Sequence, residues 1–268
     1  MSFLQLVKAE MKFIYADVFR RKSLLIMLIL WPYLLTAFIL VIGSSMGSTR
    51  VFIQRVGVDP VPFFIVSGFV LISTFSVLDD IMWKPIFDEM TGVLPYILSS
   101  PVNRVLYYAS LPVPRLILVV LIGATSLIPV LSFYWGLRGL VLALAIVVLG
   151  ILSALVFTPP AITIAMTLYR MGGESWRLIN VVRPILMLLI GAFYPRWLMP
   201  LAGYVLSSLL PPSYCIEAIQ RLLGSATSIE YALMFVGLAV ALAMIYVPAS
   251  SYSIVSWERK KLTEGVKV

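Results

Sequence analysis

The fold is decided by residues 113–168, which read "VPRLILVVLIGATSLIPVLSFYWGLRGLVLALAIVVLGILSALVFTPPAITIAMTL". This stretch contains two apolar runs, 113–135 and 140–168, and each is longer than the roughly 20 residues that a helix needs to cross the hydrocarbon core of a bilayer. Only Gly136 to Gly139 lie between the runs, so they leave room for a tight turn and nothing more. The stretch therefore predicts two membrane-spanning helices joined by a tight turn.

The composition of the whole chain agrees with a membrane protein. The 268 residues are 61% hydrophobic and 12% charged, with a mean hydropathy of +1.04, whereas soluble domains are roughly 45–50% apolar. Long apolar runs recur along the chain, so neither a signal peptide nor one buried helix explains them. The chain has no histidine, which removes the commonest general base and metal ligand, and its single cysteine, Cys215, excludes an intrachain disulfide.

The same length criterion predicts six spans in all. The four further spans are residues 24–43, 62–82, 178–194 and 229–248. The span over 178–194 is the weakest, because Arg183 and Pro184 lie inside it. Residues 1–23 carry apolar side chains at helical spacing on one side and cations on another, which is typical of a helix lying in the membrane interface. The predicted fold class is an all-α integral membrane protein, with residues 1–268 forming one transmembrane domain.

The distribution of cations predicts the orientation. If the N-terminus is cytoplasmic, fifteen lysines and arginines fall on the cytoplasmic side and five fall outside. The outer five are Arg50, Arg55, Arg138, Arg196 and Arg221. We therefore expect a multi-pass protein of the cell membrane with both termini in the cytoplasm. Topology and anionic lipid then explain the net charge of +8, and no nucleic-acid partner is expected.

Two adjacent acids end the second predicted span. Ionisable residues at such depth are costly and often functional, so Asp79 and Asp80 are candidates for the lining of a translocation path. Alternatively, they lie in the headgroup region near Lys84. A third reading adds Asp88 and makes the three acids the magnesium ligands of an intramembrane prenyl-transferase-like enzyme. Such enzymes need a second acidic cluster, and the later acids, Glu174, Glu217, Glu230, Glu258 and Glu264, are isolated.

Other catalytic patterns are weak. The segment "GSSMG" at 43–47 fits G-x-S-x-G, but a chain without histidine cannot assemble the usual triad around that serine. We therefore predict no catalytic residue and no metal ligand. The chain also lacks a G-x-x-x-x-G-K-[ST] loop, so energy for uphill transport must come from another subunit or from an ion gradient. A gradient-driven carrier remains an alternative, although the two halves show no convincing repeat.

Between the second and third predicted spans lies the segment "TGVLPYILSSPVNRVLYYAS", residues 91–110. It is broken by Pro95 and Pro101 and is too polar at its centre to cross a bilayer. Pro95 suits the first turn of a helix, and the apolar residues that follow share one face. We expect residues 88–108 to form a cytoplasmic segment with a short helix that binds a partner.

This segment resembles a known family. "GVLPYILSSPVNR", residues 92–104, is similar to the G-T-L-E-x-L-L-x-T-P-V-x-R segment in the membrane subunits of type-two ABC exporters. In that family the segment follows the second span and forms the coupling helix that docks on the ATPase subunit. The coupling residues that the resemblance implies are Asp88, Glu89, Gly92, Leu94, Leu98, Pro101 and Arg104.

A second match precedes the last span. "GAFYPRWLMP", residues 191–200, and "LLPPSYCIEAIQRLL", residues 209–223, resemble the family's S-G-x-F-Y-P…L-P and N-P-L-S-Y-x-x-E-A-x-R segments. The resemblance implies short re-entrant helices on the outer side over 195–225. It further implies a permease subunit of an ATP-driven exporter, working as a homodimer or heterodimer with a separate ATPase chain. That partner would bind ATP and magnesium, so this chain would hold no cofactor and would not itself be an enzyme. The substrate class would be drug-like molecules, lipids or polysaccharides.

Overall fold

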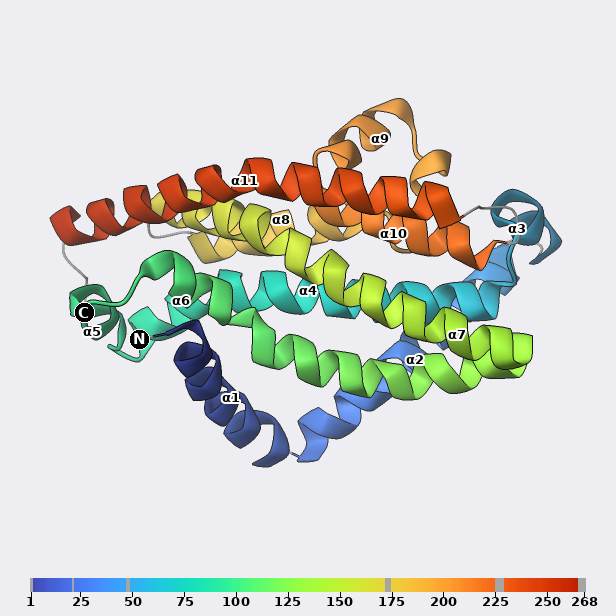
Figure 1. Cartoon of the computed structure of the whole chain (residues 1–268), viewed down its shortest axis with the longest axis horizontal. Helices are drawn as coiled ribbons and strands as arrows, with labels where there is room; N and C mark the ends of the chain where they lie inside the picture. Colours follow the sequence, from blue (N-terminus) through green and yellow to red (C-terminus); the bar gives the residue numbers. More distant parts are fainter. Residues whose placement is uncertain (1, 21, 47–48, 172–174, 225–228, 265–268) are drawn as a thin grey trace.

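The structure, a computed structural model of the whole chain, describes residues 2–20, 22–46, 49–171, 175–224 and 229–264. All regular structure in these residues is helical, which confirms the all-α prediction. The helices are α1 Phe3–Arg20, α2 Lys22–Met46, α3 Thr49–Val56, α4 Pro60–Met90, α5 Leu94–Ser99, α6 Arg104–Ser110, α7 Pro112–Arg170, α8 Ser175–Leu189, η1 Arg196–Leu198 (a 3-10 helix), α9 Leu201–Ser208, α10 Pro211–Leu223 and α11 Ile229–Glu264. The long helices lie along one axis and form an elongated bundle (Figure 1).

Helix α7 is a hairpin of two long arms. The chain reverses at Gly136, whose φ of 58° and ψ of −135° lie outside the helical region and favour glycine. The arms then close tightly, because a Cβ at Gly139 would stand 1.9 Å from the carbonyl oxygen of Leu131. The second arm runs back along the bundle (Figure 1). The tight turn predicted from the sequence is confirmed.

Helix α4 is the central helix of the core, and it makes its most extensive contacts with α7. Phe69 of α4 is fully buried between two glycines, one on each arm of the hairpin. A Cβ at Gly123 would approach Phe69 to 2.3 Å, and one at Gly150 would approach it to 2.8 Å. The absence of side chains at these positions lets both arms of α7 close around the ring.

Three helices of the described residues are long and apolar enough to cross a membrane: Pro60–Met90, Arg104–Arg170 and Ile229–Thr263. The second of these folds back at Gly136. A fourth candidate is the pair Phe3–Arg20 and Leu25–Phe38, which is bent by 89°. The chain is therefore a membrane-embedded helical protein. The helices α4 and α11 extend well past the predicted spans 62–82 and 229–248.

The predicted span over 178–194 has a different form. Helix α8 has 15 residues, which gives about 22 Å of length at 1.5 Å per residue, less than the roughly 30 Å of a hydrocarbon core. The chain turns after it at Gly191, where φ is 78°. The following residues form η1, α9 and α10, so short helices do occupy the predicted segment 195–225. Helix α9 projects from the side of the bundle (Figure 1).

Helix α10 packs against α7 and α11, and it buries Cys215 completely. Val156, Ala239 and Ala243 cluster around that side chain. The thiol is enclosed on all sides, so reagents in solution cannot reach it.

Candidate functional site

The predicted partner-binding segment forms a sharp, hydrogen-bonded turn at the end of α4. We call residues 87–108 the elbow. Gly92 has a φ of 68°, a conformation that glycine adopts readily. The Val93 N–H donates to the Asp88 carbonyl at 2.9 Å, and the Gly92 N–H donates to the Glu89 carbonyl at 3.2 Å. This pair of bonds is a Schellman motif, which ends α4 and turns the chain sharply into α5.

Helix α5 is anchored by its leucines. Pro95 lies in its first turn, as the sequence predicts. Leu94 is 0% exposed and belongs to the hydrophobic core, while Leu98 is half-buried against that core. Both leucines therefore face the bundle. The apolar face expected to meet a partner is used to hold α5 in place.

A different set of apolar side chains is exposed at the elbow. We call Phe87, Met90, Val93 and Tyr96 the exposed apolar set; Met90 is 80% exposed and Tyr96 is 76% exposed. Phe87 and Met90 lie in the last turn of α4, Val93 lies in the turn that follows, and Tyr96 lies in α5. Large apolar side chains that cluster in the sequence and remain exposed at one site are typical of an interaction surface.

Arg104 fastens the C-terminal end of α5. Its Nη2 donates to the carbonyls of Leu98 at 2.7 Å and Ser100 at 3.0 Å, and its Nη1 donates to the Val102 carbonyl at 2.9 Å. Its Nε donates to Glu258 of α11 at 3.1 Å. Arg104 thus satisfies carbonyls that the helix end leaves free and ties them to another helix. Pro101, within this loop, is exposed.

A polar network within the elbow joins α4 and α6 to each other and, through Lys84, to α1. The Tyr107 hydroxyl donates to Asp88 at 3.3 Å. Lys84 lies 3.6 Å from Asp88 and 3.5 Å from Glu10 of α1. Asn103 begins α6 by accepting hydrogen bonds from the next turn at 2.9 and 3.3 Å. Asp88 is therefore a buried structural acid and is not free to meet a partner.

The end of α11 also reaches the elbow. Lys261 donates to Glu89 at 2.7 Å, and Lys260 donates to the Arg170 carbonyl at 2.7 Å. Trp257, which is fully buried, packs edge-on against Tyr108, with ring centroids 6.1 Å apart. The start of α1 and the end of α11 thus lie at one end of the bundle, beside the elbow (Figure 1).

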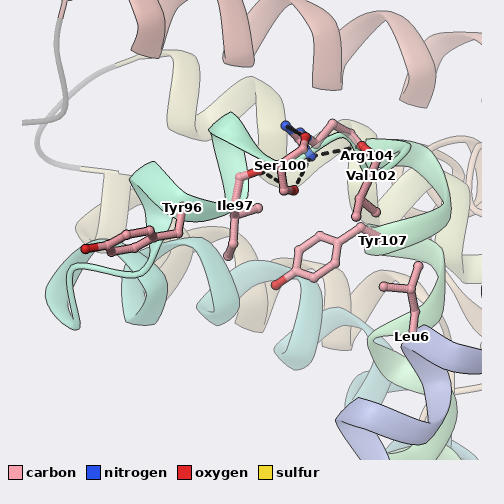
Figure 2. Close-up of a pocket in the computed structure, with 7 residues that line it drawn as sticks. All are labelled: Leu6, Tyr96, Ile97, Ser100, Val102, Arg104 and Tyr107. Atoms are coloured by element: carbon pink, nitrogen blue, oxygen red, sulfur yellow. Dashed lines mark hydrogen bonds between the residues drawn. The ribbon is translucent and has the colours of Figure 1, made fainter. Parts of the chain in front are cut away.

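A cavity of about 260 Å³ lies between α1, α5 and α6. It is lined by Leu6, Tyr96, Ile97, Ser100, Val102, Arg104 and Tyr107. Figure 2 shows Leu6 of α1 and Tyr107 of α6 on one side and Ile97 of α5 on the other. The polar groups of Arg104 and Tyr107 are already engaged with carbonyls and with Asp88. The cavity is therefore an apolar hollow beside α5.

The two adjacent acids of α4 each have an arginine partner. Arg183 of α8 donates twice to Asp79, at 2.7 and 2.9 Å. Arg115 of α7 donates to Asp80. Lys84, which the sequence suggested as their neighbour, pairs with other acids instead. Within the described residues no three acids, cysteines or histidines gather as a metal site would require. The ion pairs hold α7 and α8 against α4.

The sequence did not predict a buried charge cluster in the segment before α11. Arg196 of η1 is 1% exposed, and its Nη1 lies 3.0 Å from Oε2 of Glu217. Arg221 donates to Oε1 of the same carboxylate at 2.7 and 3.0 Å. The guanidinium of Arg196 stacks over Tyr214 at 4.2 Å. Glu217 and Arg221 are four residues apart on one helix, a spacing that allows them to pair, but nothing in the sequence joins Arg196 to a helix 21 residues later.

Gln220 completes this region. Its Nε2 donates to the carbonyls of Gly191 and Ala192, both at 2.8 Å. These two carbonyls follow the end of α8 and have left the regular helix. The Gln220 side-chain amide thus supplies the hydrogen bonds that backbone N–H groups would have donated to these carbonyls if α8 had continued.

Comparison of the chain with protein-family models, with curated proteins and with solved structures gives no match.

Proposed function

We propose that this chain is the permease subunit of an ATP-driven exporter of the ABC type. The observation that carries the proposal is the elbow: it is held from within by Leu94 and Arg104 while Met90 and Tyr96 face outward. A rigid loop that displays apolar side chains suits a surface that docks on another protein and receives force from it. The docking residues are then the exposed apolar set, while Leu94 and Leu98 hold α5 against the bundle.

The proposed topology has six spans: α2, α4, both arms of α7, α8 and α11. Helix α8 is too short to cross alone, so η1, α9 and α10 complete that crossing from the outer side. Backbone polar groups must be satisfied inside a bilayer, and the bonds from Gln220 to Gly191 and Ala192 support non-helical backbone at this depth. The excess of cations on one side supports a cytoplasmic elbow.

The proposal includes a dimer of permease chains and two copies of a separate ATPase, which binds ATP and magnesium. The translocation path formed by the two permease chains would carry a drug-like molecule, a lipid or a polysaccharide. The lining of that path by Asp79 and Asp80 stays a prediction. The alternative of an intramembrane prenyl transferase receives no support, because each of these acids pairs with its own arginine instead of sharing a cation site. No observation favours a gradient-driven carrier.

The docking surface is tested by replacing Tyr96 with aspartate. A charge in the middle of an apolar contact must be desolvated without a partner, so we expect at least about a tenfold loss of ATPase recovery. The measurement is co-purification of the tagged chain from its native membrane, with quantification of any P-loop ATPase that accompanies it. Met171→Asp is the matched control, since Met171 is exposed, apolar and at the same end of the bundle.

Recovery of the wild-type chain without an ATPase would contradict the proposed function. Equal recovery with Tyr96→Asp and with Met171→Asp would instead remove the elbow as the docking surface.

A further inference from the structure

The last turns of α11 hold the elbow at two separate points. Glu258 accepts a hydrogen bond from Arg104 at 3.1 Å, and Lys261 donates to Glu89 at 2.7 Å. The first pair joins α11 to the end of α5, and the second joins it to the end of α4 just before the turn at Gly92. Trp257 fills the space behind them against Tyr108. The same helix, α11, thus contacts the elbow on both sides of the turn at Gly92.

This arrangement makes the position of α5 depend on α11. The guanidinium that contacts Glu258 also donates to the Leu98 carbonyl of α5 and to the Ser100 carbonyl just after it. Rotation of α5 would therefore break these bonds unless α11 moved with it. We infer that Glu258 and Lys261 are positioning residues for the docking helix, so that α5 and the last turns of α11 act as one body. The inference rests on the proposed function for its consequence, which is that force on α5 enters α11 directly.

The other half of α11 contacts the segment that precedes it. The Tyr246 hydroxyl donates to the Leu209 carbonyl at 3.1 Å, and Phe235 packs against Tyr214 at 6.4 Å between ring centroids. Ala239 closes over Cys215. The helix that grips the elbow therefore also packs along α10, near the opposite end of the bundle (Figure 1). Displacement of α5 would be carried along α11 to this segment.

The Lys261–Glu89 pair offers a test that does not unfold the protein. Both side chains are partly exposed, at 21% and 32%, and exposed ion pairs contribute little to stability. We would measure hydrogen exchange of residues 94–104 in the full chain in detergent, for Lys261→Glu, for Glu89→Lys and for the two together. We expect at least threefold faster exchange in each single variant and a return to within twofold of the wild type in the double variant. Arg259→Glu, an exposed charge reversal on the same helix, is the matched control.

Recovery of the ATPase should fall in the single variants and return in the double variant, with the melting temperature unchanged throughout. A purely structural role would lower the melting temperature in the single variants. Exchange in the single variants equal to that of Arg259→Glu would overturn the inference. Because exchange is measured on the chain alone, its result is independent of whether an ATPase is recovered, and so the inference and the proposed function can fail separately.

Discussion

Replacing Glu217 with leucine is expected to lower the free energy of unfolding by about 3–5 kcal/mol. Glu217 is the carboxylate partner of Arg196, which is 1% exposed and therefore shielded from water. Removal of the carboxylate leaves a buried charge whose remaining partners among the described residues are the rings of Tyr204 and Tyr214 and the Ser208 hydroxyl. The measurement is a denaturant titration of the full chain in detergent, followed by circular dichroism.

The double variant Arg196→Met with Glu217→Leu provides the comparison. Removing both charges replaces a buried pair by apolar side chains, which costs much less than breaking the pair. We therefore expect the double variant to lose less stability than Glu217→Leu alone. Glu230→Leu is the control for loss of an exposed acid, since Glu230 lies at the exposed start of α11. A loss below about 1 kcal/mol in Glu217→Leu would contradict the argument.

Replacing Gly139 with alanine is expected to lower the free energy of unfolding by about 3 kcal/mol or more, because the structure has no space for the added methyl group. The added Cβ would stand 1.9 Å from the Leu131 carbonyl oxygen and 2.5 Å from its carbon. The obstacle is backbone, which cannot rotate away as a side chain can. The two arms of α7 must then separate, and both arms pack on α4. The same denaturant titration measures the loss.

Gly237→Ala is the matched control for this substitution. Gly237 lies inside α11, and a Cβ there would meet no atom within 4 Å. Alanine favours helix over glycine by roughly 0.5–1 kcal/mol, so this variant should be as stable as the wild type or more so. Equal losses in the two variants would show that the hairpin contact is looser than the structure indicates.

The hairpin was predictable because its signal is local. Two long apolar runs and the short glycine-containing break between them specify helices and a turn without reference to the rest of the chain. The full lengths of α4 and α11 could not be predicted in this way. Their ends are polar, and a hydropathy criterion detects only the apolar part of a helix. In these polar ends Lys84 pairs with Glu10 of α1, and Lys261 of α11 pairs with Glu89 of α4; both pairs connect residues far apart in the sequence.

The candidate site was predicted in outline only. The sequence indicated a short helix with one apolar face at the elbow, and α5 is that helix. It could not tell whether Leu94 and Leu98 face a partner or the bundle, since both environments favour leucine. Arg104 shows the same limit: its resemblance-based role was coupling, while its observed bonds run to the carbonyls of α5 and to Glu258, 154 residues later.

The enclosure of Cys215 has an experimental consequence. The single native thiol is sealed between α10, α7 and α11, so a cysteine introduced at the surface becomes the reactive one in an otherwise unaltered protein. Phe133 and Met171 are both exposed; Phe133 lies beside the turn at Gly136, where the second arm of α7 begins, and Met171 directly follows the other end of that arm. A membrane-impermeant maleimide applied to intact cells will modify a cysteine at only one of these positions, and the modified position identifies the end of the bundle that faces outward.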